Sequence, residues 1–142
     1  MHRLLVPIDG SDCSLRALRH ALDRGREGCG IELVLVHAHE APAIYGEVEI
    51  YLSRERAEEL QHQHSEALLK PAVDLIRASG RRAKTEIRIG SVAHEIVRCG
   101  EENACDGIVM GSRGMGAIGN LLLGSVATKV VHLAKVPVTL VK

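Results

Sequence analysis

The sequence predicts an α/β fold with a parallel sheet, because short apolar runs of strand length alternate with longer stretches of helical periodicity. Five strand-like runs and four helical stretches can be placed along the 142 residues. Strands separated by helices in this way form a parallel sheet with right-handed crossovers. The length suits one core, and no repeat or second set of elements is visible. We therefore interpret residues 1–142 as a single domain.

The first part of the chain is expected to form a strand, a helix and a strand. An apolar run over residues 3–8 ends at the turn sequence Asp-Gly-Ser, which predicts a buried strand. Ser11 or Asp12 can cap the next helix, whose apolar residues recur at helical spacing up to a glycine-rich breaker. Residues 31–38 form the second strand. The periodicity fails over residues 39–52, where we expect an irregular crossing.

A long helix and a third strand follow. Residues 53–79 have a helical composition, but Pro71 is expected to kink or split this helix. Gly80 ends the helix. Residues 83–89 alternate in the manner of a strand.

The last part of the chain adds two helices and two strands. Ser91 can cap a helix that runs to about residue 103, and residues 107–110 form the fourth strand. A glycine-rich turn then leads into a helix over residues 122–134. Residues 136–141 are the final strand, which a proline interrupts.

Composition and charge exclude several classes of function. Lys plus Arg balance Asp plus Glu at 18 each, so net charge gives no attraction to nucleic acid or to an anionic membrane. Two Tyr and no Trp or Phe argue against base stacking on aromatic side chains. The chain reaches Asp9 before any long apolar run, so we expect no signal peptide, no membrane segment and a cytoplasmic location. The four cysteines lack a CxxC pair and are expected to stay reduced.

The glycine-rich segment after the fourth strand is the candidate ligand site. It contains Gly111, Ser112, Arg113 and Gly114, then nine residues, then Gly124 and Ser125 at the start of a helix. Glycines let the backbone approach an anion and turn through positive φ, and the free N–H groups of a helix N-terminus bind phosphate oxygens. The alternative is that these glycines form a flexible loop that needs no ligand.

Two other phosphate motifs fit this segment poorly. Residues 114–119 satisfy G-x-G-x-x-G, but a dinucleotide fingerprint should open a helix and be followed by an acidic residue about 20 positions on. The next strand ends at Lys142 without one. Residues 119–125 imitate a Walker A loop, but the phosphate-binding Lys is missing because Leu123 precedes Gly124. We therefore do not expect a fast P-loop NTPase.

The pattern G-x-x-G, nine residues, G-[ST] resembles the ATP-binding branch of the universal stress proteins. Three further segments resemble that family. The sequence VPIDGS at residues 6–11 resembles its first strand and turn, VHA at residues 36–38 resembles the end of its second strand, and VPV at residues 136–138 resembles its closing strand. The resemblance covers essentially the whole chain. It implies a Rossmann-like, adenine nucleotide alpha hydrolase-like fold, with an open sheet in the order 3-2-1-4-5 and helices on both faces.

By resemblance, the nucleotide would lie at the switch point, where the carboxyl ends of the first and fourth strands bring Asp9 and Gly111 together. The resemblance implies that the adenine and ribose would be bordered by Pro7, Ile8 and Asp9, with Ala38 near the base. The ribose and first phosphate would be flanked by Met110 and Gly111. The phosphates would be held by Gly114, Gly124, Ser125 and Val126. Arg113 is placed to meet the phosphate charge.

Plainer interpretations of two of these residues stay open. Asp9 can be an ordinary helix-capping residue, and Ser125 can be an N-cap, although a cap and a phosphate donor use the same geometry. The chain also departs from the family pattern at Val92, where a Pro often stands two residues after the glycine. We expect this change to loosen the turn after the third strand and to have little effect on the nucleotide site.

Eight histidines invite a metal hypothesis, especially the pairs His37 with His39 and His62 with His64. We expect the members of each pair to point apart, on opposite faces of a strand or about 200° apart on a helix, so that neither pair clamps a metal. We therefore assign no metal-ligating residue. A divalent ion, Mg²⁺ or Mn²⁺, would be carried by the phosphates.

The leading functional hypothesis is a regulatory stress-response protein that binds ATP, or ADP or AMP, and changes its contacts with an unknown protein partner according to occupancy. Slow hydrolysis is one alternative, because a cradled phosphate is partly prepared for attack, but no catalytic residue is assigned. An enzyme that transfers adenylyl groups is a second hypothesis, but it would need HxGH or Ser-Gly-Gly signatures, which are missing. The third hypothesis is an interaction module that binds no nucleotide. The apolar edge strand over residues 136–141 predicts a homodimer.

Overall fold

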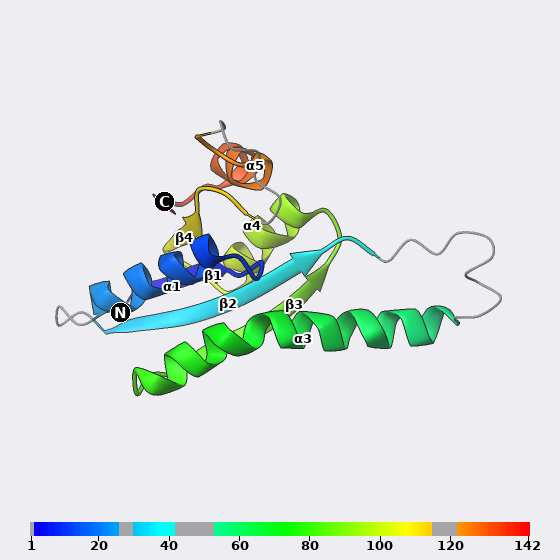
Figure 1. The fold of residues 1–142 in the computed structure, drawn as a ribbon. Helices are drawn as coiled ribbons and strands as arrows, with labels where there is room; N and C mark the ends of the chain where they lie inside the picture. The colour runs from blue at the N-terminus through cyan, green and yellow to red at the C-terminus, as the bar shows by residue number, and fades with distance from the viewer. Residues whose placement is uncertain (1, 26–29, 42–52, 115–121) are drawn as a thin grey trace.

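The computed structural model describes residues 2–25, 30–41, 53–114 and 122–142, and it contains a five-stranded parallel sheet (Figure 1). The strand order β3-β2-β1-β4-β5 is the expected one. The strands are β1 (His2–Pro7), β2 (Ile31–His39), β3 (Ala83–Ile89), β4 (Gly107–Gly111) and β5 (Val138–Val141). The helices are α1 (Asp12–Arg24), α3 (Arg54–Ala78), α4 (Val92–Glu102) and α5 (Ser125–Leu133). Most of the expected irregular crossing, residues 42–52, lies outside the described residues.

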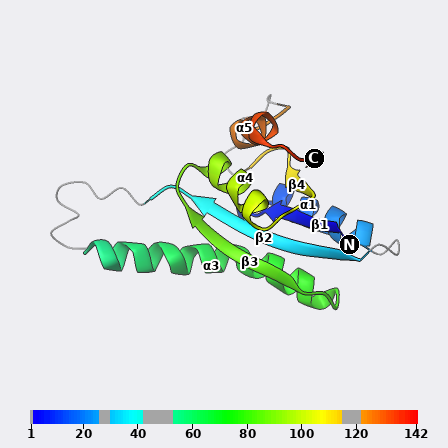
Figure 2. The ribbon, with the colours of Figure 1, turned by 180° about the vertical axis from the view of Figure 1, so that it is seen from behind.

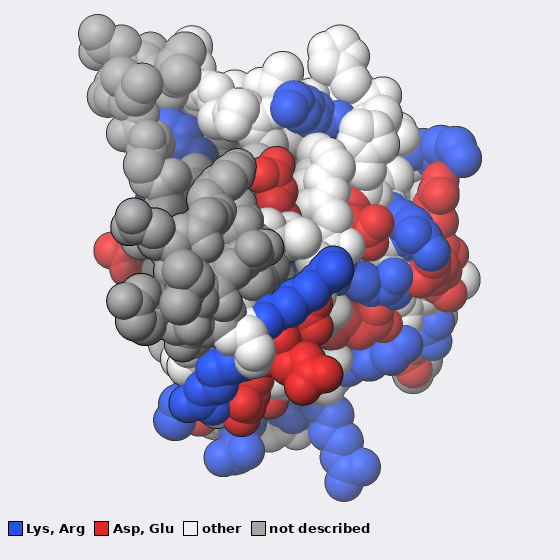
Figure 3. All heavy atoms as spheres, turned by 90° about the vertical axis from the view of Figure 1, so that its right-hand side faces the viewer, with Lys and Arg blue, Asp and Glu red and all other residues white. Residues whose placement is uncertain are grey.

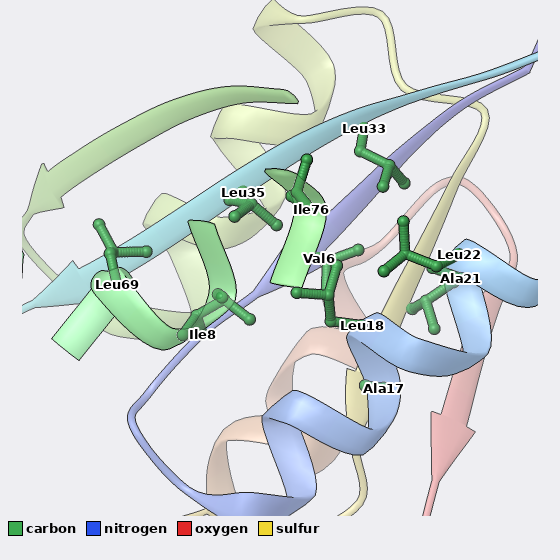
Figure 4. Close-up of a cluster of buried hydrophobic side chains, with 12 residues drawn as sticks. Val6, Ile8, Ala17, Leu18, Ala21, Leu22, Leu33, Leu35, Leu69 and Ile76 are labelled. Atoms are coloured by element: carbon green, nitrogen blue, oxygen red, sulfur yellow. The ribbon is translucent and has the colours of Figure 1, made fainter. Parts of the chain in front are cut away.

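Helices cover both faces of the sheet, because alternate residues of each central strand point to opposite faces (Figure 2). On one face, α1 and α3 pack against Val6 and Leu35, in the cluster of buried side chains drawn in Figure 4. On the other face, α4 and α5 pack against Leu5 and Val34. Strands buried on both faces need apolar residues at nearly every position, which explains their continuous apolar runs. The predicted α/β fold with two helical layers is confirmed.

Helix α3 is not split at Pro71. It runs unbroken through the proline, although its axis changes direction in its C-terminal half in both ribbon views (Figures 1 and 2). Proline removes one helical hydrogen bond, and packing on either side can compensate for that loss. Leu69 precedes the proline, Ala72 and Ile76 follow it, and all three are buried in the core. The expectation of a split is therefore wrong, and the bend agrees with the expectation of a kink.

Two elements near the C-terminus begin later than predicted. Helix α5 begins at Ser125 rather than at residue 122, because Gly124 has extended backbone angles, φ −70° and ψ 162°, and serves as its N-cap. Strand β5 begins at Val138, directly after Pro137. Proline has no N–H to donate to a ladder, and here its carbonyl oxygen accepts a bond of 2.9 Å from the N–H of Ile108.

A cluster of charged side chains fixes α4 against β3. Arg88 Nη2 lies 2.5 Å from Glu86 Oε2 and 2.7 Å from Glu102 Oε2. Burial raises the pKa of Glu86, but hydrogen bonds from Lys84, Asn103 and Arg88 outweigh it and hold the pKa at about 2. The carboxylate therefore stays ionised. This cluster ties the C-terminal end of α4 to β3, while the first turn of α4 borders the cavity described below.

Both signs of charge intermingle on the side of the molecule at which β2 and β3 end (Figure 3). Over the part of this side that the structure describes, blue and red side chains lie beside one another, most densely toward α3. This mixture agrees with the formal net charge of +0. No helix in the described ranges is long and apolar enough to cross a membrane.

Three of the cysteines are buried free thiols: Cys13, Cys99 and Cys105. Burial raises the pKa of Cys99 to about 12, so this residue remains a protonated thiol at neutral pH. Burial also raises the pKa of Cys105. These properties fit structural thiols, and Cys29 lies outside the described residues.

Candidate functional site

A cavity of about 490 Å³ lies where the carboxyl ends of β1, β2 and β4 meet the N-terminal turns of α1, α4 and α5. This volume falls within the range of small-molecule sites. Every residue predicted for the site lines this one cavity: Pro7, Ile8, Asp9, Ala38, Met110, Gly111, Arg113, Gly114, Gly124, Ser125 and Val126. The strand order causes this convergence, because it makes β1 and β4 neighbours although they are far apart in the sequence.

Five further residues line the cavity that were not among the predicted site residues: Ser14, Val36, Val92, Ile96 and Ala127. Val36 could have been found, because it lies two residues before Ala38 on the same face of its strand. Val92 and Ile96 lie one helical turn apart on α4 and could be recognised as a pair. Nothing in the sequence marks Ser14. Val92, where the chain departs from the family pattern, is thus part of the cavity wall.

Asp9 is fixed in the wall of the cavity by the turn that starts α1. Its Oδ1 accepts a bond of 2.9 Å from the N–H of Ser11 and one of 2.5 Å from the hydroxyl of Ser11. Ser11 is the actual N-cap, because its Oγ accepts a bond of 3.1 Å from the N–H of Ser14. Asp9 therefore orients the cap rather than capping the helix itself, and Gly10 permits the turn with a φ of 84°.

The described glycines of the glycine-rich segment provide space rather than positive φ. Gly111, Gly114 and Gly124 all lack positive φ, which corrects that part of the sequence interpretation. A Cβ atom on Gly111 would lie 2.9 Å from the sulfur of Cys13, and one on Gly114 would collide with Oδ2 of Asp9. Glycine at these two positions is thus required by the close approach of α1 and of the Asp9 carboxylate. The remaining glycines of the segment, Gly116 and Gly119, lie outside the described residues.

The N-terminus of α5 faces the cavity and has no side-chain cap. The N–H of Gly124 donates a bond of 2.7 Å to the carbonyl of Ser112, which joins the two ends of the glycine-rich loop. The next three residues, Ser125, Val126 and Ala127, line the cavity. Their N–H groups belong to the first turn, where a helix has no internal acceptors, and the helix dipole favours negative charge there. Ser125 is the first residue inside the helix, so it is not the N-cap.

The cavity has one apolar part and one polar part. Val36, Ala38, Val92, Ile96 and Met110 supply apolar surface from β2, α4 and β4. The polar part contains the carboxylate of Asp9, the exposed Arg113 and the first turn of α5. A flat apolar group that carries an anionic tail would match both parts.

The histidine pair on β2 differs from the prediction. The rings of His37 and His39 lie 5.8 Å apart, because alternate residues of a strand share a face; the expectation that they point apart is wrong. His37 is buried, and its Nδ1 lies 2.7 Å from the carbonyl oxygen of Ile8. Among the described residues, no group of three or more His, Cys, Asp or Glu side chains could hold a metal ion.

The fold and cavity define an α/β protein with a cavity at the carboxyl edge of a parallel sheet. Comparison with known proteins gives the family. The model of the universal stress protein family matches residues 1–142. The chain is 33% identical over 140 residues to a universal stress protein of Methanocaldococcus jannaschii, covering 99% of this chain and 81% of the relative. It is 31% identical to universal stress protein YxiE of Bacillus subtilis, covering 99% of both. The chain belongs to the universal stress protein family.

Solved structures agree with this assignment. The structure of hypothetical protein MJ0577 matches with a TM-score of 0.78 and 29% identity, covering 99% of this chain and 95% of that one. A universal stress protein from Archaeoglobus fulgidus, solved in complex with dAMP, matches with a TM-score of 0.69 and 25% identity. That match covers 100% of this chain and 98% of the other.

The contact between Gly114 and Asp9 predicts a specific cost for a methyl group at residue 114. We expect Gly114→Ala to lower the free energy of unfolding by about 1–3 kcal/mol, because the new Cβ displaces a carboxylate that Ser11 holds in place. Chemical denaturation measures this cost. In an Asp9→Ala background the cost should shrink, because the colliding oxygen is gone.

Gly124→Ala is the matched control, since a Cβ there meets nothing nearer than 3.4 Å among the atoms around it. We expect it to change the free energy of unfolding by less than about 1 kcal/mol. An equal cost of Gly114→Ala with and without the Asp9 carboxylate would contradict the proposed contact.

Proposed function

We propose that this protein binds an adenine nucleotide, ATP in the first instance, in the cavity at the carboxyl ends of β1 and β4. The observation that carries the proposal is the apolar pocket that leads to the uncapped N-terminus of α5. The dAMP complex of the related Archaeoglobus fulgidus protein supports a ligand of this kind. ADP and AMP share the base and the first phosphate, so they are alternative ligands for the same site.

In this proposal the base occupies the apolar part, and the ribose lies between the apolar and the polar part. Pro7, Ile8 and Ala38 border the base, and the Asp9 carboxylate accepts hydrogen bonds from sugar hydroxyl groups. Met110 and Gly111 flank the ribose and the first phosphate. These residues come from the ends of three strands that the sheet holds rigidly.

The phosphates lie at the first turn of α5. The N–H groups of Ser125 and Val126 donate to phosphate oxygens, and Gly124 and Gly114 line the same space from the N-cap of α5 and from the loop. Arg113, an exposed cation on the cavity wall, neutralises part of their charge. A divalent ion, Mg²⁺ or Mn²⁺, fits best when bound mainly by the phosphates, since Asp9 is the one carboxylate among the described lining residues.

The proposed role is regulatory, in the cytoplasm, with an unidentified protein partner that responds to nucleotide occupancy. Within the described wall of the cavity, the one carboxylate accepts two hydrogen bonds from Ser11, and no Lys or His is present. Hydrogen-bond donors and a helix dipole can hold a phosphate without any group that activates water. Slow hydrolysis is the alternative outcome, and measured release of phosphate from ATP distinguishes it.

Calorimetric titration of nucleotide-stripped protein with ATP and Mg²⁺ tests the site directly. We expect micromolar binding by the wild type, about −8 kcal/mol, and a loss of at least about a hundredfold in Gly124→Val, whose side chain occupies the space proposed for the phosphates. Arg113→Ala should weaken binding about tenfold through the lost charge-assisted bond.

Lys129→Ala is the matched control, because Lys129 is an exposed cation on α5 that does not line the cavity. It should bind like the wild type. Loss of binding in Lys129→Ala equal to that in Arg113→Ala would indicate a general charge effect. No binding by well-folded wild type would leave a nucleotide-free interaction module.

We also propose that the chain forms one domain and assembles as a homodimer through β5. Among the strands that the structure describes, β5 pairs with β4 alone and is an edge of the sheet. Leu140 on β5 is 38% exposed, and Val131 on α5 is 45% exposed. Apolar edge strands favour pairing with a second chain.

Sedimentation equilibrium tests this interface. Leu140→Lys should shift the protein from dimer to monomer, whereas Leu60→Lys, at an exposed position of α3, should leave the dimer intact. A dimer unchanged by Leu140→Lys would contradict this interface.

A further inference from the structure

We propose that His37 is a positioning residue for the nucleotide site, which acts from the other face of the sheet by holding the Ile8–Asp9 peptide through its ring N–H. This inference rests on the proposed function. Val36 and Ala38, on either side of His37, line the cavity, whereas His37 itself does not. Neighbouring residues of a strand point to opposite faces, so His37 lies on the face that α1 and α3 cover. It is 7% exposed.

The contacts of Ile8 show how a side chain on one face can fix a wall on the other. Strand β1 ends at Pro7, yet β2 continues to hold the next residue at both of its peptide groups. The N–H of Ile8 donates to the carbonyl of Val36 at 2.8 Å, and the carbonyl of Ile8 accepts from Nδ1 of His37 at 2.7 Å. That carbonyl belongs to the peptide that leads into Asp9. The ring therefore sets the direction in which the chain enters the turn.

The chemistry of the contact fixes the tautomer of His37. A carbonyl oxygen only accepts, so Nδ1 must carry the proton that it shares with Ile8. Burial lowers the pKa of His37, and the nearby His39 and His64 lower it further, while the bond to Ile8 and the charge of Asp9 oppose them. The ring is accordingly neutral at pH 7, with Nδ1 as its donor. Both nitrogens carry protons in the charged form, so the bond to Ile8 is kept across this titration.

Without the ring N–H, the Ile8 carbonyl loses its donor in a site where Ile8 is 2% exposed. A buried carbonyl without a partner is costly, and the chain can relieve that cost by rotating the Ile8–Asp9 peptide. Such a rotation moves the Asp9 carboxylate away from Ser11 and Gly114, which define its present place. Ligand binding then has to restore the original geometry, and affinity falls.

The test uses variants of His37 in the calorimetric titration with ATP and Mg²⁺. His37→Leu keeps a similar volume and removes the donor, and we expect about tenfold weaker binding. His37→Asn places an amide N–H near the position of Nδ1, and we expect affinity within about threefold of the wild type. In an Asp9→Ala background, His37→Leu should cause less than about a twofold further loss, because the residue through which it acts is already gone.

His39→Leu is the matched control, since its ring neighbours His37 but its Nδ1 contacts the carbonyl of Glu40. It should bind like the wild type. Equal losses in His37→Leu and His39→Leu, or no recovery in His37→Asn, would overturn the inference. If the wild type binds ATP and Gly124→Val does not, while His37→Leu binds normally, then the inference fails and the proposed function stands. No binding by any variant, including the wild type, would instead reject the proposed function.

A measurement on the unmodified chain covers the case in which His37→Leu does not fold. Imidazole ¹⁵N spectra should show His37 protonated at Nδ1, and its Nδ1–H signal should shift on titration with ATP and Mg²⁺. An Nε2-protonated ring, or a signal that ATP leaves unchanged while the Gly124 amide shifts, would contradict the proposed role.

Discussion

The parallel pairing of β1 with β4 is the constraint on which the rest of the site depends. It brings two chain segments about a hundred positions apart into adjacent strands, with Leu4 opposite Gly107 and Leu5 opposite Ile108. The turns that leave these strands must then share one space, and the Asp9 carboxylate comes to lie against Gly114. Both strands are buried on both faces, so their register is strongly specified by packing. The cavity is a consequence of this pairing, together with the helices that start at the same edge.

Much of the fold could be read from the sequence, because its strands are continuous apolar runs with turn residues at their ends. The sheet order and the convergence of the predicted site residues followed from the resemblance to one family, and the structure agrees with both. The start of α5 could not be read, because the apolar Leu122 and Leu123 continue the helical pattern although Gly124 is extended. Tertiary packing likewise carries α3 through Pro71, where local propensity predicts an interruption.

The parts of the site that sequence reasoning missed are those that depend on distances between elements. The sequence suggested that Gly111 and Gly114 allow positive φ. Glycine is needed there instead because a Cβ atom would lie too close to Cys13 and Asp9, a closeness that only the packed structure reveals. We expected Val92 to affect mainly the turn after β3, yet this residue, the first of α4, lines the cavity. His37 looked like one of a pair with His39, and its important contact is instead with the carbonyl of Ile8, just beyond the end of β1.

Amide chemical shifts during titration with ATP and Mg²⁺ test the central claim most directly, because they report which backbone N–H groups meet the phosphates. The largest changes should occur at Ser125 and Val126 in the first turn of α5, with smaller changes at Asp9 and Ala38, which border the proposed ribose and base. Saturating binding with changes confined to α3 and β3, and unchanged amides at the start of α5, would contradict it.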